Sequence, residues 1–426
     1  MDKNFLFLNI INRGKNYVHY GYVILITGIL IVMGALGFGR FGYTVIMPSM
    51  KEGLNLGYSE MGFLASGNFV GYLIFALTGG LLAVKYGPRL VIFLSLLVVG
   101  ISMFLTGLTG SFYDALFLRI ITGLGSGGSY IPVMGLMSSW FAGKRRGMAA
   151  GLLVGGTGLG LTFTGLLIPR IITYFGDWGW RYSWFALGMI VILIALLAYF
   201  TLYNDPWEKG LYPMDGYDKR GEEEEKKNRG KEAGSFNNLY KDKFLWFLGT
   251  IYSLFGFSYV IYSTFFTAYL TEGKGVEEAV AGNLWALAGV LSIFSALIWG
   301  MFSDYLGRKN ALMTVFLFQA VSFGVMAFSQ TMAGFFVSTL LFGLTAWSIP
   351  GIMAALCGDT LGPKMAPAAL GIITIGFGIG QFIGPGLSGL LLDYTSSFTA
   401  PFILSSVTAF LGGIASWFLK LQKVNN

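Results

Sequence analysis

Twelve long apolar stretches, separated by short polar segments, dominate the chain. A helix that crosses a lipid bilayer needs about 20 mostly apolar residues. Charged residues make up only 12% of the sequence, which is too few to cover a water-soluble protein of this length. We therefore predict an all-α integral membrane protein with twelve transmembrane helices, at about 20–47, 59–84, 90–109, 113–141, 147–174, 182–203, 243–270, 277–302, 310–329, 332–359, 366–392 and 398–419.

Lysine and arginine are distributed unevenly between these stretches. With the N-terminus in the cytoplasm, 22 of the 28 fall in cytoplasmic segments, and at most Lys51, Arg170, Arg181 and Lys274 fall outside. This distribution predicts a multi-pass protein of the cell inner membrane with both termini cytoplasmic. We read the net charge of +7 as a topology signal and expect membrane lipid, not nucleic acid, around the chain. We expect no cleavable signal peptide, because the first apolar stretch is too long.

The polar segment 204–242 separates the sixth stretch from the seventh. It contains Asp205-Pro206 and an acidic run from Glu222 to Glu225, and it lacks apolar periodicity. Such a segment is typical of a solvated linker. We therefore expect an N-terminal six-helix bundle at 1–203, a cytoplasmic linker at 204–242 and a C-terminal six-helix bundle at 243–426, in a chain that acts as a monomer.

The two predicted bundles resemble one another at an offset of about 220 residues. The matching pairs are Gly80–Arg89 with Gly300–Lys309, Gly158–Gly160 with Gly378–Gly380, Ile131-Pro132 with Ile349-Pro350, and Gly37–Arg40 with Gly256–Tyr259. Their common order indicates a duplicated six-helix unit. Transporters are commonly built from two such units, with the solute site between them near the middle of the membrane.

With these features the sequence resembles the major facilitator superfamily over almost its whole length. The loop Gly300–Lys309 fits the G-x-x-x-D-x-x-G-R-K loop of that family. The resemblance implies that Asp304 and Arg308, together with Lys309, belong to an inward-side charge lock that holds one conformation. The first-half copy departs from the pattern, because Val84 replaces the acid and Pro88 the first base.

Four further motifs refine the resemblance. Arg119-x-x-x-Gly123-x-Gly125 resembles the arginine motif of the fourth helix, which implies a buried structural or coupling residue grouped with the lock. Trp140–Gly151 is similar to the monocarboxylate and oxalate/formate branches, whereas GFGRFGYTVIMP at 37–48 and Ala346–Pro350 look most like the YbfB/YjiJ-type branch. The antiporter Gly-Pro motif of the fifth helix is absent, so antiport has no support.

Arg40 is the main candidate for solute binding. It lies about twenty residues into the first stretch, where an arginine costs about 2.5–3.5 kcal/mol on insertion scales, so we expect it to face a cavity or a partner. The organophosphate/phosphate exchangers of the superfamily carry a substrate arginine at this spacing before a proline. Their second arginine corresponds to Tyr259 here, and a single cation favours a monovalent anion such as a monocarboxylate. The alternative is a structural Arg40 in a proton-coupled exporter of neutral or cationic molecules.

Other polar and aromatic side chains occur near the middle of the predicted helices. Tyr43 and Tyr262 follow Arg40 and Tyr259 by three residues, so each pair shares a helix face and is expected to face a common cavity. Packing or an interfacial position is the alternative for both. The remaining candidates for solute contact are Asn68, Tyr130, Trp347 and Gln381.

Several classes of chemistry lack the residues they need. The single histidine, His19, and the single cysteine, Cys357, argue against a metal site, a cofactor and an enzyme. No nucleotide-binding loop is present, so ATP does not drive the protein. No Asp or Glu falls at mid-membrane, so a coupling proton would ride on the anion or on Asp359, and facilitated diffusion or exchange is equally compatible. We therefore predict a secondary-active or facilitative transporter that works by alternating access, with symport left open.

Overall fold

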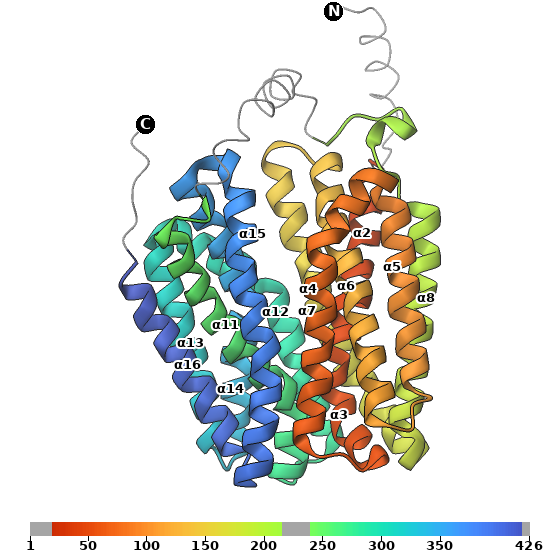
Figure 1. Ribbon diagram of the computed structural model, residues 1–426, viewed down its shortest axis with the longest axis vertical. Helices are drawn as coiled ribbons and strands as arrows, with labels where there is room; N and C mark the ends of the chain where they lie inside the picture. The colour runs from red at the N-terminus through yellow and green to blue at the C-terminus, as the bar shows by residue number, and fades with distance from the viewer. Residues whose placement is uncertain (1–18, 215–238, 420–426) are drawn as a thin grey trace, which may run out of the picture.

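The computed structural model describes residues 19–214 and 239–419, and within these ranges the protein is a bundle of long helices (Figure 1). Ten stretches are long and apolar enough to cross a membrane, and the bent helix Tyr58–Tyr86 adds another. One of the ten, Arg145–Thr201, has 57 residues and reverses direction at Gly176–Trp178, so it contains two crossings. The described residues therefore contain the twelve predicted spans.

The first six spans form the N-terminal half, which we define as the described residues 19–214. Its first span consists of three consecutive helical segments, because an α-helix gives way to a π-helix and then resumes. The elements are α2 (Gly21–Val32), η1 (Met33–Phe41), α3 (Gly42–Leu54), α4 (Tyr58–Tyr86), α5 (Pro88–Thr106), α6 (Phe112–Trp140), α7 (Gly143–Phe175) and α8 (Gly179–Thr201).

The last six spans form the C-terminal half, the described residues 239–419. One long helix, α15, contains parts of two spans, which are separated at Gly362, where the backbone has a φ of 78°. The elements are α11 (Lys243–Ala268), η4 (Tyr269–Gly273), α12 (Glu278–Leu306), α13 (Arg308–Phe328), α14 (Met332–Thr345), α15 (Ser348–Thr395) and α16 (Thr399–Trp417).

The beginning of the predicted linker packs on the N-terminal half. Met214 donates its backbone N–H to the carbonyl of Trp140 and accepts from the backbone N–H of Ala142. The 3₁₀ turn η3 (Pro206–Lys209) begins with Asp205, whose side chain caps the backbone N–H of Trp207. Residues 204–214 are therefore ordered on the bundle, and the acidic run from Glu222 to Glu225 lies outside the described residues.

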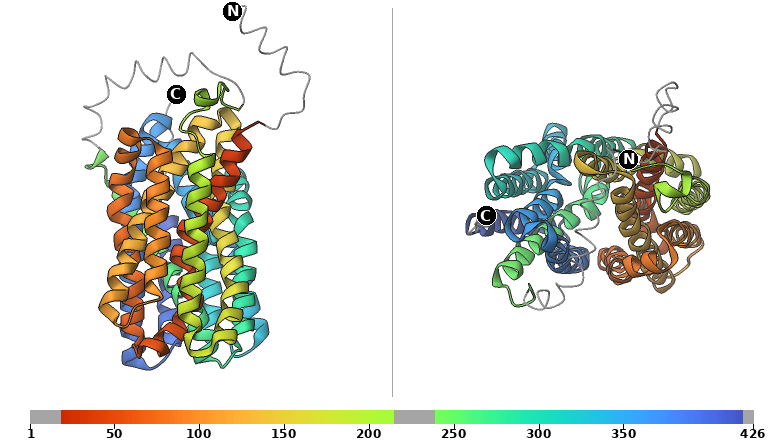
Figure 2. Two further views of the ribbon diagram at one scale, coloured as in Figure 1. Left: turned by 90° about the vertical axis from the view of Figure 1, so that its right-hand side faces the viewer. Right: turned by 90° about the horizontal axis from the view of Figure 1, so that it is seen from above.

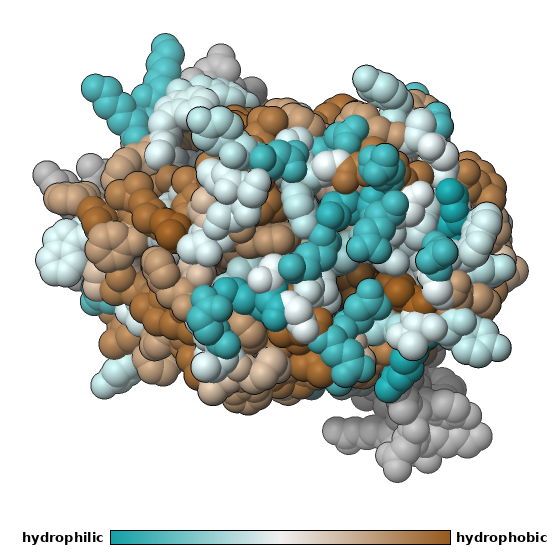
Figure 3. All heavy atoms as spheres, turned by 90° about the horizontal axis from the view of Figure 1, so that it is seen from below, coloured by the Kyte–Doolittle hydropathy of each residue, from teal (hydrophilic) through white to brown (hydrophobic). Residues whose placement is uncertain are grey.

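The helices stand side by side, and the two halves lie next to one another when seen from above (Figure 2). Twelve crossings return the chain to the side on which it began, so α2 begins and α16 ends at the upper end of Figure 1. The loops that join odd to even spans lie at the lower end. At that end hydrophilic side chains gather on the face of the bundle, while apolar side chains surround them (Figure 3). Large apolar side chains such as Phe200, Phe294 and Trp417 are exposed on the helix sides, as expected where lipid replaces water.

Glycines allow the two halves to approach closely along one seam. Helix α4 packs against α15, α7 against α12 and α3 against α11. A Cβ atom on Gly165 would lie 2.4 Å from the carbonyl oxygen of Gly282, and one on Gly158 would lie 2.6 Å from that of Gly289. Only glycine permits such backbone contact between membrane helices. We call this α7–α12 contact the glycine seam.

Polar contacts between the halves lie in the middle and in the lower part of the bundle. Between residues that are described on both sides, those near the middle join Arg40 to the hydroxyl of Tyr259, Ser66 to the carbonyl of Phe382 (2.6 Å) and Thr162 to the carbonyl of Ala286 (3.3 Å). The others lie closer to the lower loops. The lower end is thus closed, and no comparable bond joins the described residues of the halves at the upper end.

Candidate functional site

Arg40 lies in the π-helical segment η1, not in a regular α-helix. This segment contains Gly34, Gly37 and Gly39, which weaken the α-helical preference and allow close packing. A Cβ atom on Gly37 would lie 2.6 Å from the backbone of Gly160 in α7. The π-helix is rare and is frequent at functional sites. Here it places Arg40 in the interior of the bundle, where 8% of its surface is exposed.

The guanidinium of Arg40 is held by aromatic faces and has no described carboxylate partner. It lies 4.6 Å from the ring centre of Phe69 and 4.3 Å from that of Tyr72, both on α4. Its Nε and Nη2 atoms are buried and have no hydrogen-bond partner among the described residues. Buried donors without an acceptor are costly, and more so when charged. These N–H groups are therefore available to an anionic acceptor.

Arg119 is a second buried guanidinium near the first. It is 1% exposed, and its Nη1 donates to the carbonyl of Gly39 at 2.7 Å. Its guanidinium lies over the ring of Tyr43 at 4.7 Å, and its Nε has no partner among the described residues. Arg119 therefore does not lie with Asp304 and Arg308, and its assignment to the charge lock is corrected: it belongs to the interior of the N-terminal half.

Both guanidiniums line one small cavity between the halves, which we call the central pocket. It has room for about one water molecule. The N-terminal half supplies aromatic and hydroxyl groups beside the two arginines, and α11 supplies the opposite wall. The lining residues are Arg40, Phe41, Tyr43, Thr44, Ala65, Phe69, Arg119, Val260, Ser263 and Thr264.

Tyr259, Gln381 and Trp347 approach Arg40 from the C-terminal half. Gln381 hydrogen-bonds the hydroxyl of Tyr259 through Nε2, and this hydroxyl in turn interacts with Arg40. The indole of Trp347 packs between two aromatic rings, with its ring centre 5.3 Å from that of Phe41 and 5.9 Å from that of Tyr259. Its Nε1 is buried without a described partner. Three predicted residues thus meet Arg40 or its immediate neighbours across the interface.

Tyr130 also lies on the Arg40 side of the interior. Its hydroxyl is close enough to Arg40 and Tyr72 to interact with both. The sequence analysis missed Tyr72, Phe69 and Tyr252, which extend this aromatic wall; Tyr252 stacks on Phe377 at 4.4 Å. Tyr72 follows the predicted Asn68 by one helical turn, and that spacing was the signal available for it.

Three other predicted residues are directed elsewhere. Tyr43 lines the central pocket, but its hydroxyl donates to the carbonyl of Met61 at 2.7 Å. Tyr262 is buried inside the C-terminal half, where its hydroxyl bonds Ser338 at 2.8 Å, so it does not meet Arg40. Asn68 lies between α4 and α6, and its Nδ2 donates to the carbonyl of Arg119 at 3.3 Å. The cavity that Tyr43 and Tyr262 were expected to share is therefore not formed.

The loop Gly300–Lys309 of the C-terminal half forms an ion-pair network within that half. Arg308 bonds Asp304 at 2.5 Å and Asp359 at 2.7 Å, and its Nη1 also donates to Ser303 at 2.6 Å. Asp359 therefore partners the lock arginine. Lys309 is partly buried beside it. None of these bonds reaches the N-terminal half, so in this conformation the network does not tie the halves together.

The lower end is closed by acidic residues of the C-terminal half, a set of contacts we call the lower gate. Glu272 pairs with Lys51 at 2.6 Å and accepts a hydrogen bond from the hydroxyl of Tyr58. Asp393 accepts from the backbone N–H groups of Tyr58, at 3.0 Å, and Ser59, at 2.8 Å, where α4 begins. A carboxylate is favourable at a helix N-terminus, which leaves its first N–H groups unpaired.

A proline contributes a further contact between the halves. Pro48 lies inside α3 and cannot donate the hydrogen bond that the carbonyl of Thr44 would otherwise accept. The hydroxyl of Thr267 on α11 donates to this carbonyl instead, and the hydroxyl of Thr44 donates to the carbonyl of Ser263 at 2.8 Å. The backbone bond that the proline removes is therefore replaced by one from the other half.

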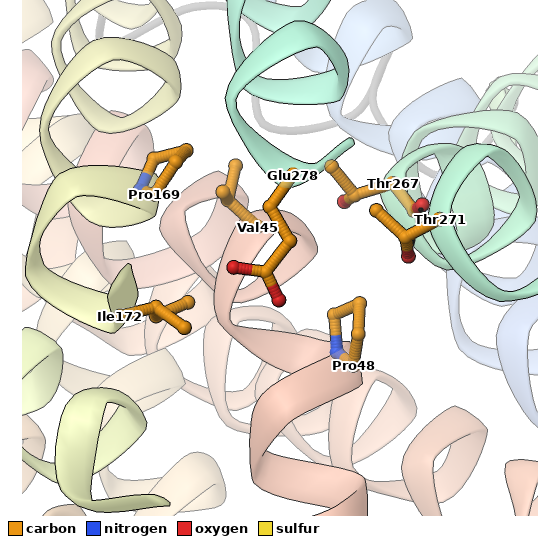
Figure 4. A pocket seen from close by; sticks show the side chains of 7 residues that line it. All are labelled: Val45, Pro48, Pro169, Ile172, Thr267, Thr271 and Glu278. Atoms are coloured by element: carbon orange, nitrogen blue, oxygen red, sulfur yellow. Dashed lines mark hydrogen bonds between the residues drawn. The ribbon is translucent and has the colours of Figure 1, made fainter. Parts of the chain in front are cut away.

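A second cavity, the lower pocket, lies beside the lower gate. It is lined by Val45, Pro48, Pro169 and Ile172 from the N-terminal half and by Thr267, Thr271 and Glu278 from the C-terminal half. Figure 4 shows the carboxylate of Glu278 directed between Val45 and Pro48. The exposed Glu52 is close enough to repel it. A partly buried carboxylate thus faces a largely apolar wall.

Comparison with known proteins agrees with this architecture. The chain is 24% identical over 414 residues to the "Probable sulfoacetate transporter SauU" of Cupriavidus necator, covering 93% of each chain. It is 23% identical over 389 residues to the "Hexuronate transporter" of Bacillus subtilis, covering 88% of this chain and 89% of the relative. A bacterial homologue of the human lysosomal transporter Spinster, solved in an inward-facing, occupied conformation, has the same fold, with a TM-score of 0.74 at 15% identity and 94% and 97% coverage. The nucleoside transporter NupG gives a TM-score of 0.72 at 12% identity, covering 95% of this chain and all of that one.

The family follows from a match that extends over nearly all of the described helices. Residues 32–417 match the family described as "Uncharacterised MFS-type transporter YbfB". This range contains Arg40, the central pocket, the lower gate and the ion-pair network of Arg308. The chain therefore belongs to this YbfB-type family of the major facilitator superfamily, and it is a transporter and not an enzyme.

Proposed function

We propose that the protein carries a small organic anion, such as a monocarboxylate, across the cell inner membrane, and that the anionic group binds Arg40. The observation that carries this proposal is the buried guanidinium of Arg40, which lies between the halves with two nitrogens, Nε and Nη2, unpartnered among the described residues. Its planar fork matches a carboxylate or a sulfonate. Two relatives named as a sulfoacetate and a hexuronate transporter agree with an anionic solute.

The transport mechanism is alternating access between two half-bundles. The lysine and arginine distribution places both termini in the cytoplasm, and in that orientation the closed lower end faces outward. Arg40 belongs to the N-terminal half, whereas Tyr259 and Trp347 belong to the C-terminal half. A bound anion therefore contacts both halves and favours their closure. All of these groups come from one chain, so a monomer is sufficient.

The competing function is a proton-coupled exporter of neutral or cationic molecules with a structural Arg40. The stacking of the guanidinium on Phe69 and Tyr72 favours that alternative, because aromatic faces stabilise a guanidinium without any solute. The two functions differ in what Arg40→Lys changes. Lysine keeps the charge but loses the fork, which contributes about 1.5–3 kcal/mol for hydrogen bonds to a charged group.

Thermal stabilisation of the purified, detergent-solubilised protein distinguishes the two. The probes are acetate, isethionate, sulfoacetate, glucuronate, glucose and choline. We expect the anions to stabilise the native chain and to lose at least tenfold in apparent affinity with Arg40→Lys. Arg170→Lys is the matched control, because Arg170 is exposed and bonds only the carbonyl of Leu166 in its own helix. Stabilisation by glucose or choline alone, equal in all three proteins, would overturn the proposal.

A further inference from the structure

We propose that Arg119 is the second cation of the anion site, so that Arg40 and Arg119 together select a doubly charged organic anion over a singly charged one. This inference rests on the proposed function and deepens it. The expectation of a monovalent solute assumed that Arg40 was the single cation of the site, because the repeat-equivalent position holds Tyr259. With Arg119 as a second cation, that expectation no longer applies. Both guanidiniums line the central pocket, and both are more than nine-tenths buried.

The first argument is the incomplete satisfaction of both arginines. Arg119 uses Nη1 for the carbonyl of Gly39, which leaves its Nε unpartnered, while Arg40 has both Nε and Nη2 unpartnered. A purely structural arginine at this depth is expected to satisfy its donors with backbone or side-chain acceptors. Three unpartnered nitrogen donors on two neighbouring guanidiniums instead match the two or more oxygens of a carboxylate or sulfonate.

The second argument is the charge balance. The two guanidiniums repel one another across the central pocket. Within the described ranges, no ion pair joins either of them to an acidic residue. A monoanion leaves one of the two positive charges uncompensated in a site of low dielectric constant, whereas a dianion compensates both. Selectivity for two negative charges follows from this difference.

The third argument is the composition of the opposite wall. Thr264 contributes a hydroxyl group from α11, whereas the hydroxyls of Thr44 and Ser263, which also line the pocket, already donate to the carbonyls of Ser263 and Val260. Hydroxyl groups donate to anionic oxygens without adding charge. The pocket holds only a compact group, so the remainder of the solute extends from Arg40 toward Tyr130 and Tyr259, whose hydroxyls interact with Arg40.

Sulfoacetate and isethionate form a suitable pair of probes. Both carry a sulfonate on a two-carbon chain, and they differ in that sulfoacetate ends in a carboxylate and isethionate in a hydroxyl. Isothermal titration of the detergent-solubilised protein gives both dissociation constants. We expect the native chain to bind sulfoacetate at least tenfold more tightly than isethionate, and Arg119→Gln to reduce that ratio below threefold while isethionate still binds through Arg40.

Controls separate this inference from the proposed function and from misfolding. Arg181→Gln removes another arginine of the same half that bonds backbone carbonyls, those of Gly107 and Thr109, and it should leave the ratio unchanged. Should Arg119→Gln not be recovered folded, Arg119→Lys keeps the charge, and we expect it to keep the preference for sulfoacetate while weakening both anions. A structural role for Arg119 would instead change both affinities equally with glutamine.

Two results overturn the inference. One is equal affinity of the native chain for the two anions, and the other is an unchanged ratio in Arg119→Gln. If, in addition, Arg40→Lys weakens both anions at least tenfold, the proposed function stands and only the role of Arg119 fails. If neither anion binds the native chain while glucose or choline stabilises it, the proposed function fails as well.

Discussion

One carboxylate of the lower gate, that of Glu272, joins the two halves through two contacts, and its removal should open the lower end measurably. Glu272 belongs to the C-terminal half, and its two partners, Lys51 and Tyr58, belong to the N-terminal half. Glu272→Gln removes the charge from both contacts while keeping the size of the side chain. It should therefore weaken the closed state without altering the fold of either half.

The expected magnitude follows from the burial of the pair. Hydrogen bonds to charged groups contribute about 1.5–3 kcal/mol each, whereas exposed ion pairs contribute less than about 1 kcal/mol. The side chains of Lys51 and Glu272 are 17% and 19% exposed, so the pair lies between these limits. A loss of about 2 kcal/mol changes the ratio of closed to open molecules about thirtyfold, which turns a ratio of about 99 to 1 into about 3 to 1.

Distances between spin labels at the lower end measure this ratio. Tyr174 on α7 and Tyr394 on α15 are 82% and 90% exposed and belong to different halves, so cysteines introduced there accept labels. The native Cys357 is buried and is the only cysteine. In lipid vesicles, Glu272→Gln should convert about a quarter of the population to a longer distance.

The matched control changes the same chemical group without touching the gate. Glu277 is exposed at the beginning of α12, five residues from Glu272. Glu277→Gln should leave the distance distribution as in the native chain. An unchanged distribution in Glu272→Gln, or an equal change in both variants, would refute the argument that this carboxylate holds the lower end closed.

Three further substitutions should change the same label distance in stated directions. Glu278→Gln should favour the closed lower end by about tenfold, because an amide costs less than a carboxylate to hold in the lower pocket, and opening or no change would contradict this. Asp393→Ala should favour the open lower end by about 1 kcal/mol, the usual contribution of a helix cap, because it removes the acceptor for the first N–H groups of α4. A ratio of closed to open molecules equal to that of the native chain would contradict this role. Gly282→Leu should hold the lower end open in most molecules, because a Cβ atom there would lie 2.4 Å from the carbonyl oxygen of Gly165. A label distance equal to that of the closed native chain would show that the glycine seam does not require close approach.

The number and order of the spans were predictable because the bilayer imposes a length and an apolar composition on every crossing. Arg40 was predictable for the same reason, since a charge in an apolar stretch requires a partner in the interior. Gln381 and Tyr259 were recognisable as polar groups at mid-span, and the structure confirms that they lie together. Whether any of these residues touches the solute stays a prediction.

The direction of individual side chains was not predictable. Tyr43 follows Arg40 by three residues, but Arg40 lies in the π-helical η1 and Tyr43 in the α-helical α3, so the regular spacing assumed for the pair does not hold. Tyr262 and Tyr259 share one helix, yet Tyr262 turns toward Ser338 inside its own half. Hydropathy cannot distinguish these faces, because the interior of a membrane bundle is as apolar as its lipid surface.

Contacts between distant parts of the sequence were also out of reach. Asp359 pairs with Arg308, 51 residues away, and no local pattern links the two. The position of Arg119 beside Arg40 depends on how α6 packs against η1, where Gly39 approaches Ser126 and Thr122. This packing makes Arg119, which the sequence places in a fourth-helix motif, a neighbour of the main candidate for solute binding.

The glycine seam also bears on how the halves can move. Where α7 meets α12, glycine backbones are in direct contact at Gly158–Gly289 and Gly165–Gly282, and these four residues have no side chain to reorient. A rocking motion about this line therefore costs no side-chain entropy at these four positions. The glycine seam can thus act as the axis of the rocking motion. Its glycine positions are constrained by the need to have no side chain, and not by a contact that a side chain would make.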